Sequence, residues 1–210
     1  METTQVGLYT RHGFGDHYVL GIVNYGRQEY DTNRLIDIGV VQQSTASYGA
    51  NQLGTLIEYG QNRIFGNFVA QPLVAMQYIN QQTDAFTEQG AGGSSLAVAG
   101  RTDDSLRGSI GARLLMPLEF ADGRRLVPEI SGRFMHEFLD GSQTIGATFV
   151  GAPGTPFTIQ GVSAGENFVL YGAGASYTLT RHVSLYGHYI GQATSQLTSH
   201  TGTGGLSVMW

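Results

Sequence analysis

The feature that most constrains this chain is a period-two alternation of apolar and small polar residues, which is clearest between His200 and Trp210. Successive side chains of an extended strand point to opposite faces. One face here carries apolar residues and the other small polar ones, namely Leu206, Val208 and Trp210 against Thr203, Gly205 and Ser207. A strand with lipid on one side and a hydrated lumen on the other has this pattern. An edge strand of a soluble sheet shows it too, so the rest of the chain must decide.

Composition narrows the class of protein. The chain has 210 residues, of which 13% are charged and 10% are aromatic, with 31 Gly and no Cys. This is too aromatic and too sparsely charged for a disordered protein, and the length suits one domain. The lack of Cys excludes disulfides and thiolate metal sites, and the net charge of -5 argues against a nucleic-acid partner. No apolar run approaches the roughly 18 residues of a transmembrane helix, so any membrane span must consist of strands.

Strand-like segments recur along the whole chain. We predict nine of them: Gln5 to Gly13, His17 to Tyr30, Tyr48 to Tyr59, Asn67 to Asn80, Ser105 to Leu118, Leu126 to Phe138, Phe168 to Leu179, His182 to Gln192 and His200 to Trp210. Tight connections alternate with long ones, the long ones being Asp31 to Ser47, Gln81 to Asp104, Leu139 to Asn167 and Ala193 to Ser199. Transmembrane barrels have short turns on the periplasmic side and longer loops outside. The fold class that we predict is therefore all-β, an antiparallel up-and-down transmembrane β-barrel.

Alternation within the segments assigns residues to the two faces of the wall. The predicted outward, lipid-facing set is Val19, Val23, Ile57, Val74, Ile110, Leu114, Ile130, Phe134, Leu185, Leu206 and Val208. Aromatic residues near segment ends predict girdles at the headgroup level, formed by Tyr18, Tyr25, Tyr59, Tyr78, Phe120, Phe138, Tyr177 and Tyr189. The charges predicted to face the lumen and to pair across it are Glu58, Arg107, Arg113, Glu129, Arg133 and Glu137. The alternative is that these charges lie on a solvated sheet face.

The number of segments bears on completeness. Bacterial single-chain barrels have even strand numbers, and every strand edge must be paired in lipid. The first residues, Met1 to Gln5, lack the basic and apolar regions of a secretory signal. We therefore expect an incomplete barrel from the back part of a longer precursor, or else a soluble cytoplasmic protein. Alone, an incomplete barrel should insert poorly or self-associate.

Catalytic and cofactor motifs are weak. Gly161 to Gly165 matches G-x-S-x-G, but no helix pattern follows it, as a nucleophile elbow would require. His136 and Glu137 are not part of an H-E-x-x-H zinc motif. The glycine-rich stretch Gly90 to Gly93 lacks the Lys-Ser or Lys-Thr pair that follows the glycines of a phosphate-binding loop. We predict no enzyme activity, no metal site and no cofactor.

A series of short motifs runs through nearly the whole chain in order. They are Asn51 to Leu53 followed by Glu58 to Gly60, Gln71 to Leu73 with Tyr78, Asp104 to Arg107 with Gly111 to Arg113, Pro128 and Glu129 with His136 to Phe138, Gly151 to Pro153, Gly172 to Gly174, and Leu206 to Trp210. With these motifs the chain resembles the autotransporter β-domain, the translocator of type V secretion. The resemblance implies a twelve-stranded barrel threaded by an N-terminal helix from a secreted passenger. Residues 1–210 resemble its last nine strands, so that the passenger, the linker helix and the first strands are absent.

The resemblance also implies a function, a location and partners. It implies a bacterial outer-membrane barrel that anchors a passenger and helps to export it, in contact with lipid. The terminal residues Leu206, Val208 and Trp210 match the family signal that the barrel assembly machinery reads. A porin-like channel and a soluble β-sandwich binding module are the alternatives. An upstream passenger would distinguish a translocator from a channel, and insertion into lipid would exclude the sandwich.

Overall fold

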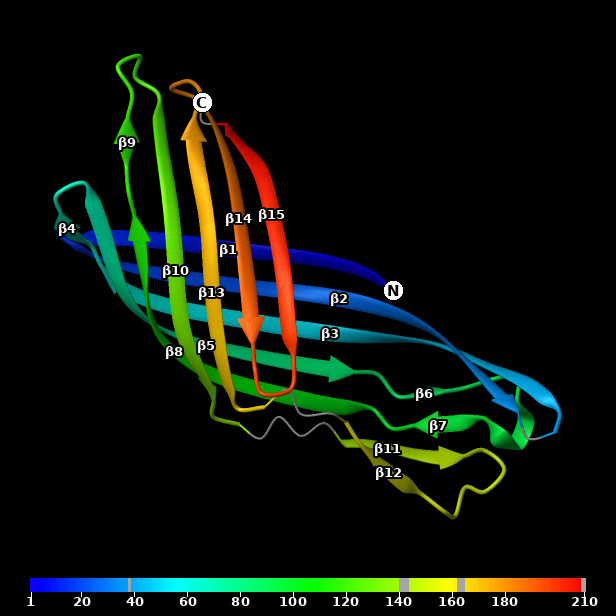
Figure 1. Ribbon diagram of the computed structural model, residues 1–210. Coiled ribbons are helices and arrows are strands. Elements are labelled where there is room, and N and C mark those ends of the chain that lie inside the picture. Colours follow the sequence, from blue (N-terminus) through cyan, green and yellow to red (C-terminus); the bar gives the residue numbers. More distant parts are fainter. Residues whose placement is uncertain (38, 140–143, 162–164, 209–210) are drawn as a thin grey trace.

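Nine long antiparallel strands form one continuous wall, in which the spatial order of the strands follows their order in the chain (Figure 1). The computed structural model describes all residues except 38, 140–143, 162–164 and 209–210. The long strands are β1 (Glu2–Phe14), β2 (His17–Asp37), β3 (Val41–Gln61), β5 (Phe68–Thr83), β8 (Arg101–Leu115), β10 (Arg125–Glu137), β13 (Asn167–Thr178), β14 (Val183–Ala193) and β15 (Thr198–Val208). The predicted up-and-down antiparallel topology is confirmed.

The shorter elements extend this wall at its two ends. At one end, β4 (Arg63–Phe65) pairs with β5 and β9 (Leu118–Glu119) pairs with β10. At the other end lie β6 (Phe86–Thr87), the 3-10 turn η1 (Gly92–Ser94), β7 (Leu96–Val98), β11 (Thr144–Phe149) and β12 (Phe157–Gln160). These four short strands make a second sheet in the order β12-β11-β7-β6. Among the described residues, no helix is long and apolar enough to cross a membrane.

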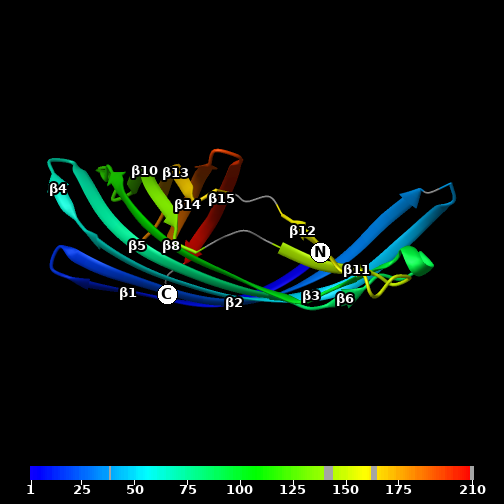
Figure 2. The same ribbon diagram turned by 90° about the horizontal axis from the view of Figure 1, so that it is seen from below.

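The wall is strongly curved. Seen from below, β10, β13, β14 and β15 rise from one side of the sheet that contains β1, β2 and β3 (Figure 2). The result is a half-barrel, with β1 and β15 at the two ends of the strand order. Every residue of β1 is exposed, as are nearly all residues of β15, because each has a neighbouring strand on one side only.

Glycine allows the wall to pack closely at several cross-strand positions. The ring of Tyr18 covers Gly60, where an added Cβ would lie 2.4 Å from the ring. Tyr186 on β14 is paired with Gly205 on β15, and its ring covers that glycine in the same way. At the short turns, Gly15 and Gly66 adopt φ values of 60° and 58°, which other residues rarely adopt. The abundance of Gly therefore reflects both tight turns and rings that lie flat against the sheet.

All four long connections differ from the sequence prediction. Residues 31–37 and 41–47 are strand rather than loop, and they pair from Asp31↔Ser47 to Asp37↔Val41. The alternation was not visible there because both faces of this hairpin carry polar residues. Parts of the loops 81–104 and 139–167 form the second sheet. Between β14 and β15 the connection is only a short turn, in which the Thr194 hydroxyl accepts hydrogen bonds from the backbone N–H groups of Gln196 and Leu197.

Candidate functional site

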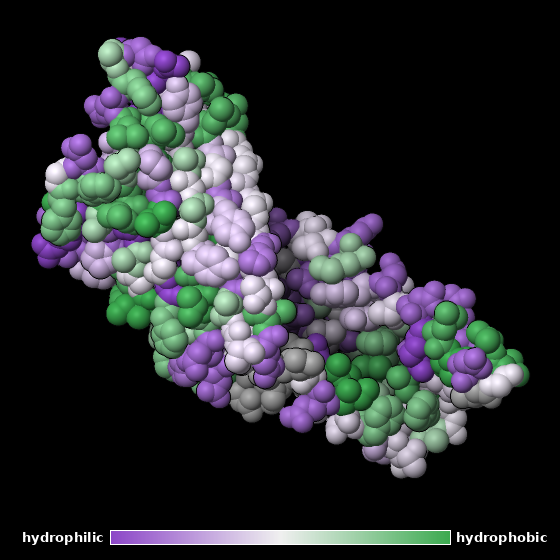
Figure 3. All heavy atoms as spheres, in the orientation of Figure 1, coloured by the Kyte–Doolittle hydropathy of each residue, from purple (hydrophilic) through white to green (hydrophobic). Residues whose placement is uncertain are grey.

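The long strands separate an apolar outer face from a charged inner face. Every residue of the predicted outward set is exposed, from 36% for Val19 to 64% for Ile57. Outside the last two strands, β14 and β15, the neighbouring positions are more enclosed, and Glu58, beside Ile57, is only 2% exposed. Figure 3 shows hydrophobic groups below the hydrophilic β9–β10 turn at the top of the molecule. An exposed apolar outside and an enclosed charged inside are the reverse of a soluble sandwich.

The apolar outer face has two borders. On β5 it runs from Phe68 through Val74 and Met76 to Tyr78, after which the outward side chains become polar. The Tyr78 hydroxyl and the Asn80 amide both donate to Asp104 Oδ1, at 2.6 and 2.8 Å. The eleven residues from Phe68 to Tyr78 span ten intervals, or about 34 Å along the strand and roughly 24 Å at a tilt of about 45°. This matches the apolar band of about 25 Å in outer-membrane barrels.

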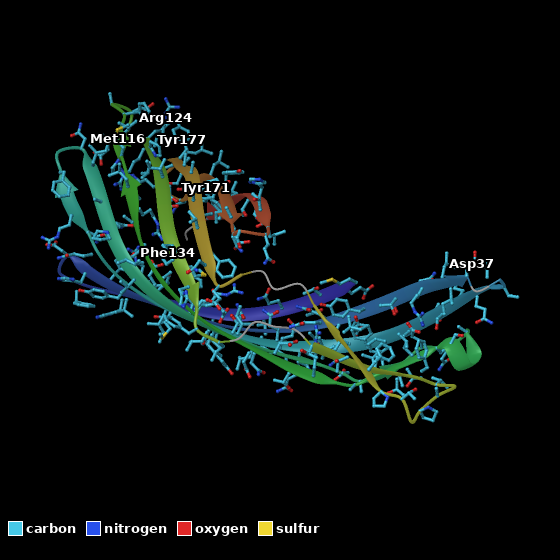
Figure 4. The ribbon with its side chains drawn as sticks, turned by 60° about the horizontal axis from the view of Figure 1, so that its bottom comes forward. Asp37, Met116, Arg124, Phe134, Tyr171 and Tyr177 are labelled. Carbon is cyan, nitrogen blue, oxygen red and sulfur yellow. The ribbon has the colours of Figure 1, made fainter. Side chains whose placement is uncertain are left out.

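The two ends of the molecule differ in the residues that they carry and in how far the strands extend. Figure 4 shows Met116, Arg124 and Tyr177 together at the end with the short turns, and Asp37 at the opposite end. The Arg124 guanidinium lies 5.9 Å from the centre of the Tyr177 ring and pairs with Asp122. Aromatic rings with a charged partner are typical of a membrane border. Beyond the other border, β2, β3 and the second sheet project past the apolar band.

Glu58 on β3 is the centre of the main inner cluster. Arg133 on β10 donates to Glu58 Oε2 at 2.6 Å, and Arg113 on β8 lies 3.6 Å from Oε1. The Tyr18 hydroxyl donates to Oε1 at 2.9 Å, and Arg113 also donates to Gln71 Oε1 at 3.3 Å. The two arginine side chains are 20% and 27% exposed. The cluster thus joins strands that lie far apart in the sheet, because the wall curves and the side chains are long.

Glu137 forms a second inner cluster at the end of β10 that lies away from the short turns. Its carboxylate accepts hydrogen bonds from the Ser105 hydroxyl at 2.5 Å, the Leu106 N–H at 2.8 Å and Arg107 Nε at 2.8 Å. The Arg107 guanidinium stacks over Phe168, 4.8 Å from the ring centre. The buried Glu137 carboxylate is therefore held by backbone and side-chain donors, which lowers the cost of keeping its charge away from water.

The sixth predicted charge, Glu129, belongs to neither cluster. Its Oε1 lies 3.2 Å from Nδ1 of His188 on β14. Glu129 also lines a hollow of about 570 Å³ on the inner face, together with Arg113, Arg133 and His188. The structure thus gives each of the six predicted charges a partner of opposite or titratable charge on the inner face.

Comparison with known proteins assigns this wall to a family. A model of the autotransporter β-domain matches residues 1–190. The chain belongs to the autotransporter β-domain family. Membership places it in the bacterial outer membrane, in a family of transport barrels rather than enzymes. No curated protein matches the sequence.

A solved structure shows the same fold. The translocator domain of the autotransporter NalP from Neisseria meningitidis matches with a TM-score of 0.69 at 19% identity. The match covers 99% of this chain and 66% of that one, so the chain spans a little less than two thirds of the solved translocator. At this level of identity the likeness supports the barrel fold.

Some inner-face residues of this autotransporter β-domain were missed or misplaced by sequence reasoning. Tyr18 was predicted for the outer girdle, but it is 2% exposed and points inward to Glu58. Its place follows from alternation on β2, where Val19 and Val23 point outward, and from Gly60 opposite, which leaves room for the ring. Gln71 and Ser105 complete the clusters, and His188 is the partner of Glu129; none of the three carries a signal in the sequence that separates it from other polar residues.

The predicted assembly-signal residues lie on the last strand of the β-domain. Leu206 and Val208 are 58% and 50% exposed and pair with Leu185 and Val183 on β14. Trp210 lies outside the described residues, as does Ser163 of the G-x-S-x-G motif. Across the part of the chain that the structure describes, no three His, Asp or Glu side chains are placed to hold a metal ion.

Beyond the border at Tyr78, the buried carboxylate of Glu88 links a loop of the β-domain to the β2–β3 hairpin by hydrogen bonds. Glu88 is 9% exposed and accepts hydrogen bonds from Arg34 Nε at 3.0 Å and Nη2 at 2.5 Å. The Ser44 hydroxyl and the Leu96 N–H also donate to it, at 3.1 and 2.9 Å. The hydrogen bonds from Arg34 are the main reason that the pKa of Glu88 lies below its ordinary value.

This pKa shift predicts acid opening of the loop. Because the folded-state pKa is lowered, the stabilisation is full above the ordinary value of about 4.3 and is lost as the pH falls through the lower folded value. We expect Glu88→Gln to lower the local stability of the 84–100 segment by about 1–2 kcal/mol, which raises its rate of proteolysis at pH 7 on the order of tenfold. The cleavage rate of this variant should also depend less on acidic pH. Glu29→Gln, an exposed change on β2, is the control. Equal cleavage of both variants would contradict the role of Glu88.

Proposed function

We propose that this chain is the wall of a translocator that anchors a passenger polypeptide in the outer membrane and supports its export. The observation that carries the proposal is one set of strands with an apolar outer band and an ion-paired inner face. The outer band inserts into lipid, and the paired strands satisfy the backbone within hydrocarbon. The hydrated, charged inner face gives an extended polypeptide polar surroundings. No bond is made or broken in this function.

The wall requires neighbours for this role. Lipid cannot satisfy the unpaired N–H and C=O groups on the free sides of β1 and β15. We therefore infer that strands outside this chain, from the parent protein, pair with both edges. The partial coverage of the NalP translocator domain supports this inference.

Display of the passenger on cells tests the function. In cells that produce the parent protein, protease added outside should release the passenger when this domain is intact. Deletion of residues 1–210 should leave the passenger inaccessible. Release that does not depend on the domain would refute translocation, and solute conductance without passenger display would make the barrel a channel.

The terminal segment is proposed as the signal for the barrel assembly machinery. Leu206 and Val208 alternate outward on an edge strand, which allows pairing with an assembly factor by strand addition. Deletion of Trp210 from the parent is then expected to reduce assembly in cells at least tenfold, with only a modest effect on spontaneous folding into synthetic bilayers. Comparable losses in the two assays would make Trp210 an ordinary girdle residue.

A further inference from the structure

The second sheet continues the barrel wall beyond the membrane. β6 follows β5, β7 precedes β8, β11 follows β10 and β12 precedes β13. The order β6-β7-β11-β12 therefore repeats the order of the long strands from which they extend. The Asp84 N–H donates to the Gly49 carbonyl at 2.9 Å, and Thr45 and Gln89 form a bridge, so β6 lies beside β3.

The register shows which face of this sheet continues the inner face. β2 and β3 pair without interruption over their whole length, so Tyr48 and Glu58 on β3 point to the same side. The Tyr48 ring stacks on Phe86 at 4.2 Å and on Tyr30 at 5.1 Å. Phe86 is paired with Val98, Val98 with Ala147, and Ala147 with Phe157. This side of the second sheet is therefore the continuation of the charged wall.

The two faces of the second sheet have opposite chemistry. Within the paired residues of these four strands, the face that continues the inner wall is apolar, and consists of Phe86, Leu96, Val98, Ile145, Ala147, Phe149, Phe157 and Ile159. The other face carries small and polar residues, which are Thr87, Ala97, Thr144, Gly146, Thr148, Thr158 and Gln160. Two hollows of about 350 and 500 Å³ lie against the sheet, and both are lined by Ala97 and Thr148.

Among the described residues, part of this apolar face is exposed. Phe149 is 40% exposed and Ile159 is 47% exposed. Figure 3 shows hydrophobic groups gathered over the end of the molecule that carries β11. Apolar side chains on the concave side of a water-exposed sheet indicate a surface that is covered during function. The surface continues the charged inner wall beside β3 and along the same strand order, so it lies at the end of the inner face.

We infer that this apolar face is a docking surface for the exported polypeptide as it leaves the barrel, an inference that rests on the proposed function. The occupant is an extended passenger segment with apolar side chains. In the lumen such a segment meets ion pairs and makes few apolar contacts. At the exit it would bury apolar side chains against Phe149, Phe157 and Ile159, which disfavours its return into the charged lumen.

Site-specific cross-linking in the parent protein tests this inference. A photoreactive p-benzoylphenylalanine is placed at Phe149 or Ile159, and at Thr148 or Thr158 as the matched positions on the opposite face of the same strands. The passenger is stalled by a disulfide-closed loop fused to it. We expect cross-links to the passenger from positions 149 and 159 at least fivefold above those from 148 and 158. Equal yields on both faces, or cross-links only to other barrel segments, would overturn the docking surface.

A second measurement uses point variants of the exposed residues. The double change Phe149→Asn and Ile159→Asn is expected to slow the appearance of passenger outside the cell about three- to tenfold, while Thr148→Asn with Thr158→Asn leaves the rate unchanged. The amount of heat-resistant folded barrel is measured in parallel and should be equal in the two variants. Unchanged export in the Phe149→Asn and Ile159→Asn variant would refute the docking surface but leave the proposed function intact. Absence of passenger export from the unaltered parent would refute the proposed function and this inference together.

Discussion

Replacing Glu58 with Leu is expected to lower the free energy of unfolding by about 2–4 kcal/mol. The change leaves Arg113 and Arg133 without their carboxylate partner and removes the acceptor of the Tyr18 hydroxyl. Breaking a buried ion pair by removing one partner costs roughly 3–5 kcal/mol, and partial exposure of the two arginines reduces that figure. Urea titration of the parent barrel in lipid vesicles measures the effect.

Two further variants separate the charge from packing. Glu129→Leu removes a carboxylate that is 23% exposed and whose ion-pair partner among the described residues is His188, so the expected cost is about 1 kcal/mol or less. Adding Arg133→Met to Glu58→Leu removes one of the unpaired charges and should recover part of the loss. An equal cost for the changes at Glu58 and Glu129 would show that the Glu58 cluster contributes no more than an exposed ion pair.

Replacing Ile110 with Arg is expected to destabilise the barrel in lipid by about 2–4 kcal/mol, because Ile110 is 63% exposed on the outer face near the middle of the apolar band. Ser109→Arg is the control on the adjacent, inward position of the same strand, where the register places Glu58 two strands away on the same face. We expect a cost of less than about half as much. Equal tolerance of the two changes in a bilayer folding titration would contradict the assignment of faces.

Much of the wall was predictable from the sequence. The outward set, from Val19 on β2 to Val208 on β15, is exposed as predicted. The direction of a strand side chain depends only on whether its position is odd or even, so a local pattern is sufficient. Where both faces are polar, as in residues 31–47, the pattern vanishes, and the sequence did not predict that β2 and β3 continue past the membrane border.

The partners of the inner charges depend on tertiary structure. Glu58 and Arg133 are 75 residues apart and lie three strands apart in the sheet, about 14 Å along a flat one. The register of four strands, the curvature of the wall and the length of the two side chains together bring Arg133 Nη2 to 2.6 Å from Glu58 Oε2. The same holds for Glu88 and Arg34, whose contact depends on how a loop folds back onto a hairpin.

By itself the sequence determined the fold class, the two faces of the strands and the family, because alternation, turns and short motifs are local properties of the chain. The tertiary structure decided that Tyr18 faces inward, that Glu58 and Glu137 centre separate clusters, and that an apolar sheet continues the charged wall beyond the membrane. Each of these depends on which strand lies beside which, and in what register. Those pairings join residues that are distant in the chain, so no local pattern records them.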